Sequence, residues 1–287
     1  MEAKKILLPT DFSPCASAAL STALFYADTL GAELHILHAI VRPEQEESLP
    51  FPDPDELERA MQKVAEVEMQ KLLHTYKELP LDIVEITRRG ITNSGVILDY
   101  IQKNEIDMTV MGTHGRTGLK HFFLGSVAEE VVRLSECPVI TTRWVEGADP
   151  LKAVDRILVP VDFSEISEKS LTTAADLARF HSASATLVHV LEDYAFPQGW
   201  EAGAVLVDQR GADLEKLAGK YFAHDQKWET RVLMGPPVRT LLNYLESYPH
   251  DLLVCATHGF TGWGHVLLGS IAERLVRLAG CPVYTVK

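Results

Sequence analysis

Several features that define common protein classes are scarce in this chain of 287 residues. It holds 4 cysteines and no CxxC pair, so buried reduced thiols are favoured over disulfides or a metal site. No apolar run approaches the length of a membrane span, and the first residues lack the apolar stretch of a signal peptide. We therefore expect a cytoplasmic protein with no metal and no membrane partner.

Basic residues are also in the minority. The chain carries 27 Lys and Arg against 40 Asp and Glu, which gives a net charge of −13 at pH 7. Such a chain lacks the positive field that non-specific binding to DNA or RNA requires, so a nucleic-acid partner is not expected. A nucleotide-sized anion can still bind locally, because N–H groups at a helix start attract phosphate without adding to the net charge.

The usual phosphate-binding loops are absent, but a long internal repeat is present. There is no Walker sequence and no G-x-G-x-x-G after a strand. Instead, residues 111–143 recur as residues 255–287 with about 18 of 33 positions identical, and the segment from Lys5 is mirrored from Arg156. The length suits two domains, which we expect at residues 1–147 and 153–287 with a Gly-, Asp- and Pro-containing linker between them.

The first half alternates strand and helix signals. Ile6 to Leu8 form a short apolar run typical of a strand that is covered on both faces. Ser13 and Pro14 then predict the start of a helix that ends at Gly31. The full order, β-α-β-α-β-α-β-α-β, predicts an α/β fold with a parallel sheet and helices on both faces. Ligands of such folds bind beyond the carboxyl ends of the strands.

The repeated segment contains a loop with the spacing G-x2-G-x9-G-S, formed by Gly112, Gly115, Gly125 and Ser126. Glycines let the backbone turn sharply and let a ligand approach the main chain. The last two residues open a predicted helix, whose free N–H groups and positive dipole end suit a phosphate. Two cations in the loop, Arg116 and Lys120, would neutralise further charge.

Interpretations without a ligand remain open for these residues. Ser126 and Glu129 fit a capping box, which needs no phosphate, and the glycines also suit simple turns. Asp11 and Asp162 each end the first strand of their half. Such an acid can accept a hydrogen bond from a ribose hydroxyl or a base amino group, or from backbone N–H groups at the next helix start.

The histidines do not suggest a metal site. His35 and His38 lie three apart on a predicted strand, so they point to opposite faces and cannot chelate one ion together. His38 and His189 occupy matching positions in the repeat, and we expect both to be hydrogen-bonded core residues. His114 and His258 lie in the glycine loop, where they either bond a phosphate or brace the loop.

The segments PTDFS and MGTHGRTGLKHFFLGSVAEEVV and the motif CPV resemble the universal stress protein family, in the form with two tandem domains. The resemblance covers nearly the whole chain and implies an open five-stranded parallel sheet of order 3-2-1-4-5 in each domain. It also implies binding of ATP, with or without magnesium. The first-half residues that correspond to the family's site are Pro9, Thr10, Asp11, Ile40, Val41, Met111, Gly112, His114, Gly115, Arg116, Gly125, Ser126 and Val127.

The second half departs from the family pattern at its glycine loop. Ala256 replaces the first glycine, where we expect its methyl group to crowd the phosphates, and Phe260 and Gly264 replace the two loop cations. We therefore predict a weaker second site. Its residues would be Pro160, Val161, Asp162, Cys255, Ala256, His258, Gly259, Gly269, Ser270 and Ile271.

The function predicted from the resemblance is that of an ATP-binding regulatory stress protein, acting through nucleotide-dependent conformation or partner contact. Efficient catalysis is not expected, because the loop shows no evident general base and no Walker-type metal acid. The alternatives are a slow ATPase and a nucleotide-free module for dimerisation or partner binding. The resemblance also implies that the last strands of the two domains pair within the chain, which leaves other surfaces for a homodimer.

Overall fold

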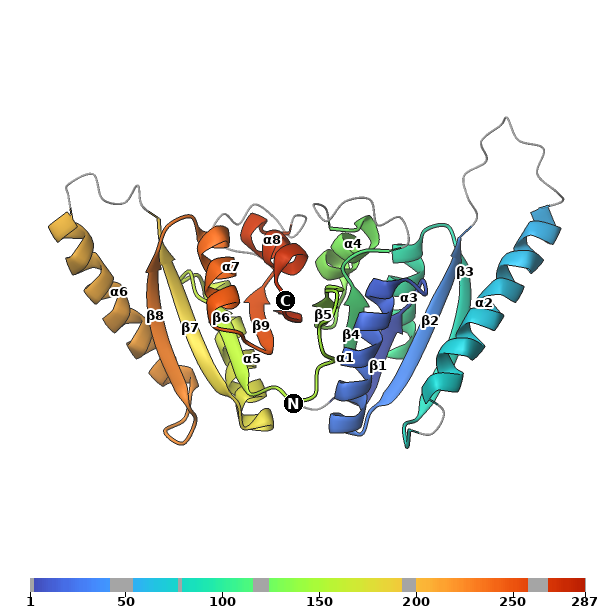
Figure 1. Ribbon diagram of the computed structural model, residues 1–287, viewed down its shortest axis with the longest axis horizontal. Helices are drawn as coiled ribbons and strands as arrows, with labels where there is room; N and C mark the ends of the chain where they lie inside the picture. The colour runs from blue at the N-terminus through green and yellow to red at the C-terminus, as the bar shows by residue number, and fades with distance from the viewer. Residues whose placement is uncertain are drawn as a thin grey trace, which may run out of the picture.

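The structure is a computed structural model that describes residues 3–41, 54–76, 79–115, 124–192, 200–257 and 268–286. Two sets of alternating strands and helices lie side by side, and both chain ends lie near the middle (Figure 1). The first half consists of β1 (Lys5–Pro9), α1 (Pro14–Leu30), β2 (Glu33–Val41), α2 (Pro54–Tyr76), β3 (Ile83–Gly90), α3 (Asn93–Asn104), β4 (Met108–Gly112), α4 (Ser126–Leu134) and β5 (Val139–Thr142).

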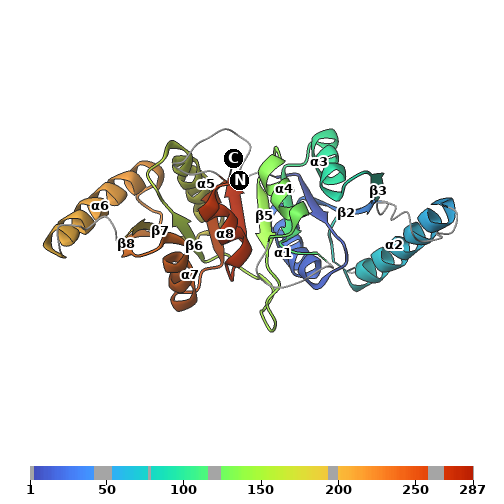
Figure 2. The same cartoon turned by 90° about the horizontal axis from the view of Figure 1, so that it is seen from above.

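The second half repeats this order from the end of the linker. Seen from above, α2 and α6 lie at the two far ends of the molecule (Figure 2). The second half consists of β6 (Arg156–Pro160), α5 (Glu165–His181), β7 (Ser184–Leu191), α6 (Trp200–Tyr221), β8 (Trp228–Met234), α7 (Pro237–Ser247), β9 (Leu252–Ala256), α8 (Ser270–Leu278) and β10 (Val283–Val286).

The ends of α1 follow from the local sequence. The Ser13 hydroxyl accepts a hydrogen bond from the Ala16 N–H at 3.2 Å, and Pro14 occupies the first helical position. At the other end Gly31 adopts the left-handed conformation, with φ of 62°, that closes many helices. Both predicted ends of this helix are confirmed.

All ten strands form one sheet, in the order β3-β2-β1-β4-β5-β10-β9-β6-β7-β8. The predicted order 3-2-1-4-5 is confirmed within each half. The two five-stranded units continue into one sheet, because β5 and β10 pair antiparallel, with Thr141 opposite Val283 and Ile140 opposite Tyr284. The pairing of the last strands within the chain, which the family resemblance implies, is confirmed. Each of these strands would otherwise be an unpaired sheet edge, and their pairing inside the chain satisfies both edges.

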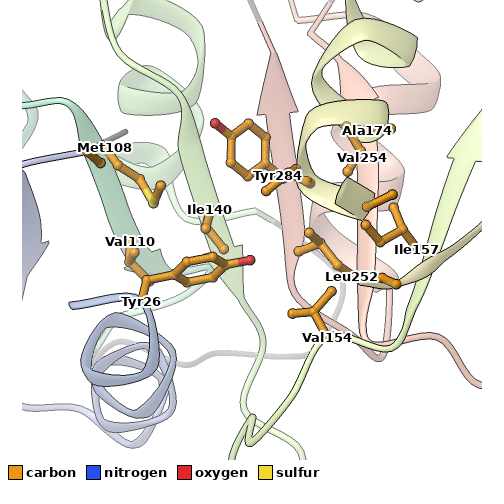
Figure 3. Close-up of a cluster of buried hydrophobic side chains, with 14 of the residues drawn as sticks. Tyr26, Met108, Val110, Ile140, Val154, Ile157, Ala174, Leu252, Val254 and Tyr284 are labelled. Atoms are coloured by element: carbon orange, nitrogen blue, oxygen red, sulfur yellow. The ribbon is translucent and has the colours of Figure 1, made fainter. Parts of the chain in front are cut away.

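Side-chain alternation along the strands builds a core on each face of the sheet. One cluster packs the sheet against α1, α2, α5 and α6, and the other packs it against α3, α4, α7 and α8. The first cluster crosses the junction of the halves without a break (Figure 3). There Tyr26, Met108, Val110 and Ile140 lie near Val154, Ile157, Leu252, Val254 and Tyr284.

Polar contacts also cross this junction. The Thr285 hydroxyl donates to the Val139 carbonyl at 2.8 Å, and the Arg143 guanidinium donates to the Leu278 carbonyl at 3.2 Å. Between helices α1 and α5, the rings of Tyr26 and His181 meet edge to face with centroids 5.8 Å apart. The two halves therefore share one core and a common set of hydrogen bonds.

The four cysteines are free, as the sequence predicts. Burial raises the pKa of the Cys255 and Cys281 thiols to about 12, so both are protonated at neutral pH. Within the described part of the chain, no helix is long and apolar enough to cross a membrane. The same residues contain no group of three or more His, Cys, Asp or Glu side chains that could hold a metal ion.

Candidate functional site

A cavity of about 450 Å³ opens at the carboxyl ends of β1, β2 and β4. It lies where the strand order reverses, since β1 has β2 on one side and β4 on the other. Its volume falls in the range of small-molecule sites. Among the predicted site residues, those that line it are Pro9, Thr10, Asp11, Val41, Met111, Gly112, His114, Gly115, Gly125, Ser126 and Val127.

Two predicted first-half residues are not part of this lining. Ile40 is buried, with 4% of its surface exposed, while its neighbours Ala39 and Val41 line the cavity. Adjacent side chains of a strand point to opposite faces, which accounts for the difference. Arg116 lies outside the described residues, as do Lys120, His258, Gly259, Phe260 and Gly264.

Sequence reasoning missed the wall of the cavity that α2 and α3 provide. Met61 comes from α2, and Asn93 and Ile97 come from the first turns of α3. The apolar residues fit the ordinary core pattern of an amphipathic helix, so the sequence carries no signal for Met61 or Ile97. Asn93 resembles a residue that begins a helix. The remaining unpredicted lining residues are Ala16, Leu37, His38, Ala39, Thr113 and Ala128.

The start of α4 faces the cavity without a side-chain cap. Gly125 is the N-cap residue, and Ser126 is already the first helical residue, so the capping-box interpretation of Ser126 is wrong. The Gly125 N–H donates to the Thr113 carbonyl at 2.9 Å, which anchors the loop to the end of β4. Backbone N–H groups at the helix start therefore border the cavity, where a negative charge is favoured. Gly269 and Ser270 repeat this arrangement at the start of α8.

A side chain at any of the three loop glycines would contact the protein itself. A Cβ on Gly112 would lie 2.9 Å from the backbone of Cys15, and one on Gly125 would lie 3.1 Å from the Thr113 carbonyl oxygen. At the first-half position that matches Ala256, a methyl group would thus meet the protein itself. That Ala256 crowds the phosphates of a ligand in the second half stays a prediction.

Asp11 lies between the first helix and the glycine loop. Its Oδ1 accepts from the Ser13 N–H at 3.1 Å, and Asp162 forms the matching bond with Ser164 at 3.0 Å. The helix-start role of this acid is therefore present in both halves. In the first half the same carboxylate also lines the cavity, where Oδ2 would lie 2.6 Å from a Cβ on Gly115.

Histidines brace the strand ends of both halves, as expected for hydrogen-bonded core residues. His38 Nδ1 lies 2.8 Å from the Thr10 carbonyl oxygen, and His189 Nδ1 lies 2.7 Å from that of Val161. Burial lowers the pKa of His189, which favours the neutral ring. In the glycine loop, His114 Nδ1 lies 2.9 Å from the Thr113 hydroxyl, a contact that braces the loop.

The second half changes polarity at three matching positions. Val161 stands in place of Thr10, and Pro237 stands at the first position of α7 where Asn93 begins α3. Glu192 follows β7 at the position of Val41 in β2, as the strand registers show. A carboxylate at this position adds negative charge where the first half has an apolar side chain.

Comparisons with known proteins agree with the repeat. The sequence profile of the Universal stress protein family matches residues 2–143 and again residues 153–287. A universal stress protein of Mycobacterium bovis is 30% identical over 183 residues, which are 63% of this chain and 61% of that protein. The chain thus matches about three fifths of that relative's length. A second one, from Mycobacterium tuberculosis, is 26% identical over 97% of this chain and 94% of its own length.

The fold also matches solved structures. The crystal structure of a universal stress protein from Archaeoglobus fulgidus superposes with a TM-score of 0.72 at 22% identity. The match covers 100% of this chain and 99% of that one. This likeness extends through both halves of the fold.

Proposed function

The chain belongs to the universal stress protein family in its tandem two-domain form, and we propose that its first half binds ATP as a regulatory ligand. One observation carries the proposal: the uncapped start of α4 borders the same cavity as Asp11. Helix N-termini favour phosphate groups, and a strand-end carboxylate favours hydroxyl donors. A nucleotide presents both groups at once.

The lining residues suggest how ATP would be held. The backbone N–H groups and the hydroxyl at Ser126 would bind the triphosphate, and Asp11 would accept from the ribose. The base would lie among Val41, Met61 and Ile97, which offer an apolar surface. Magnesium would accompany the triphosphate, since this ion is commonly held by substrate phosphates, water and only one or two carboxylates.

Regulation would follow from where the ligand touches the protein. Bound ATP would contact α4, whose following strand β5 forms the junction with the second half. A ligand shifts a conformational equilibrium when it binds one arrangement better than another. ATP would thereby alter the surfaces that this chain presents to a partner or to a second copy.

Binding is favoured over turnover. Asp11 is the one carboxylate among the described residues that line the cavity, and it is already held by the Ser13 N–H. It is therefore poorly placed to activate a water molecule at the far end of a triphosphate. At most slow hydrolysis is proposed, which a phosphate-release assay would measure as turnover per site.

The nucleotide content of the purified protein tests the proposal. The protein would be purified without added nucleotide and denatured, and the released nucleotides identified and counted by chromatography. We expect about one ATP per chain, lost in Gly125→Trp and kept in the matched control Gly269→Trp, because only the first site is intact. Absence of released nucleotide, together with no uptake of added ATP, would favour a nucleotide-free partner-binding module instead.

A further inference from the structure

A second cavity, here named the α3 cavity, has a volume of about 660 Å³ and lies between the carboxyl end of β3 and helix α3. β3 is an end strand of the sheet, so this cavity lies at the outer margin of the first half (Figure 1). No described residue lines both the α3 cavity and the first cavity, which opens at the ends of β1, β2 and β4. Its volume suits a small molecule.

Positive side chains dominate the polar lining of the α3 cavity. Among the described residues, its charged lining consists of three cations, Arg88, Arg89 and Lys103, and one acid, Asp99. The whole chain carries a net charge of −13, so this local excess of positive charge is opposite to the overall balance. A cavity with such a lining attracts anions even in an acidic protein.

Arg88 is the cation whose charge is most available to a ligand. It is exposed, and it forms no ion pair or hydrogen bond with another described residue. Burial raises the pKa of Tyr100, and the positive charge of Arg88 opposes that rise, which places the guanidinium near the tyrosine in the cavity wall. The Tyr100 hydroxyl is already engaged, 2.8 Å from His35 Nδ1. A guanidinium in this setting can bind an oxyanion through two N–H groups.

The other two cations extend the positive region along the cavity. Arg89 donates to the Gln62 side chain at 2.7 Å, which holds it in place. Lys103 is paired with Asp99 at 2.8 Å, but both side chains are more than half exposed, and such a pair contributes little. Positive charges that are spread along a cavity suit a ligand with more than one anionic group.

The second half shows that the fold does not require this charge. Strand register places Leu233 at the position of Arg88 and Met234 at that of Arg89. Charged side chains on an end strand can serve to prevent edge pairing. β8, the other end strand of the sheet, carries no charge at these two positions.

An arginine also lies beside the matching tyrosine of the second half, but its charge is compensated. Arg231 acts on Tyr244 as Arg88 acts on its own tyrosine. Arg231 is paired with Glu229 at 2.6 Å, whereas Arg88 has no acid partner among the described residues. The uncompensated arginine is therefore a feature of the first half.

We propose that the α3 cavity is a second ligand site, for a small molecule that carries two or more phosphate groups. Arg88 would bind one phosphate through two N–H groups, and Lys103 would bind another in exchange for Asp99. Phosphate groups carry more than one negative charge near pH 7, so they gain most from several cations. The proposal does not depend on ATP binding, because the first cavity has a separate lining.

Inorganic pyrophosphate is the probe, titrated into the full chain by calorimetry at low ionic strength. We expect the natural protein to bind it and Arg88→Gln to bind it about tenfold more weakly, because a charge-assisted hydrogen bond is lost. Arg231→Gln is the matched control, since this arginine lies on the other end strand and lines neither cavity. It should keep the affinity of the natural protein.

Asp99→Asn should have the opposite effect, which partial unfolding cannot imitate. Removing the acid leaves Lys103 available to the ligand and should tighten pyrophosphate binding about twofold to fivefold. Asp176→Asn is the matched control, because Asp176 pairs with Arg179 at 3.1 Å on α5 and is exposed to a similar degree. That variant should bind pyrophosphate as the natural protein does.

Ser126→Ala locates the probe, since phosphate can also bind at the start of α4. A loss of affinity in Ser126→Ala without a loss in Arg88→Gln would place pyrophosphate in the first cavity and overturn the proposal. No measurable binding by the natural protein would overturn it too, as would equal affinities in the natural protein, Arg88→Gln and Asp99→Asn. Failure of ATP to bind would instead overturn the proposed function and leave the α3 cavity as a site.

Discussion

The backbone of Gly115 lies against the carboxylate of Asp11, so closely that a Cβ on the glycine would come within 2.6 Å of Oδ2. This contact joins the loop after β4 to the end of β1, which lie more than a hundred residues apart in the sequence. The glycine and the acid pack against each other, and both line the cavity. A change at either residue should therefore disturb the other.

Gly115→Ala should weaken ATP binding by about tenfold, because the new methyl group displaces a carboxylate that we propose to bind the ribose. Titration calorimetry with ATP would measure the loss. The control is Gly211→Ala in the interior of α6, where a Cβ would meet nothing within 4 Å. That variant should keep its affinity and gain about 0.5–1 kcal/mol of stability. Unchanged affinity in Gly115→Ala would show that Asp11 does not contact the ligand.

Ser126→Ala should weaken ATP binding and leave the free energy of unfolding within about 0.5 kcal/mol of the natural protein, because this hydroxyl caps no helix. Ser13→Ala should instead leave ATP binding unchanged and lower the free energy of unfolding by about 1 kcal/mol, because the N-cap of α1 is lost. Urea unfolding and ATP titration would separate the two effects. Ser270→Ala is the matched control in the second half, and an equal loss of affinity there would place ATP in the second site.

The stability of the fold should decrease as the pH falls below about 6.5. Burial lowers the pKa of His35, His181, His189 and His250, so the unfolded chain binds protons more readily than the folded one. These histidines do not change the free energy of unfolding at a pH where they are neutral in both the folded and the unfolded chain. Their destabilising effect grows as the pH falls through the pKa of histidine in the unfolded chain. Urea midpoints at pH 7.5 and pH 6.0 would measure the decrease.

His250→Gln provides the control for this pH effect. His250 Nε2 lies 3.2 Å from the Thr186 hydroxyl, and Nδ1 lies 2.6 Å from the Tyr248 carbonyl oxygen. The substitution removes the titrating group and should make the difference between the two midpoints smaller. An identical difference in the variant would show that His250 does not contribute.

Thermal unfolding should occur as one cooperative transition, because the core on the α1 and α5 face crosses the junction of the halves. In scanning calorimetry the measured enthalpy should then equal the van't Hoff enthalpy. Tyr284→Ala truncates a buried residue at the junction, which is 5% exposed. It should lower the free energy of unfolding by about 3–5 kcal/mol. Two resolved transitions in the natural protein would contradict a shared core.

Much of the fold was predictable because its signals are local. Ser13, Pro14 and Gly31 fix the ends of α1 through caps that act within one turn. The order of strands in each half also agrees with the family resemblance. The resemblance also implies that the last strands pair within the chain, but the antiparallel register of Ile140 with Tyr284 joins residues far apart in the sequence and has no local signal.

The site was predictable on one wall and not on the other. Glycine spacing identifies the loop that holds Gly112, Gly115 and Gly125, since close contacts with neighbouring residues leave little room for a side chain there. Met61 and Ile97 line the opposite wall with ordinary apolar side chains, which look the same whether they face a core or a ligand. The hydroxyl of Ser126 fits a capping box in sequence, and only the helix boundary shows that it is one position too late.

The junction of β5 with β10 also has a consequence for how the two halves can diverge. In a symmetric homodimer one gene encodes both copies, so every substitution appears twice and neither copy can change alone. Fusion into one chain removes that restriction: Glu192 and Pro237 occur in one half while Val41 and Asn93 are kept in the other. It also makes the pairing of β5 with β10 intramolecular, so dilution cannot separate the first half from the second.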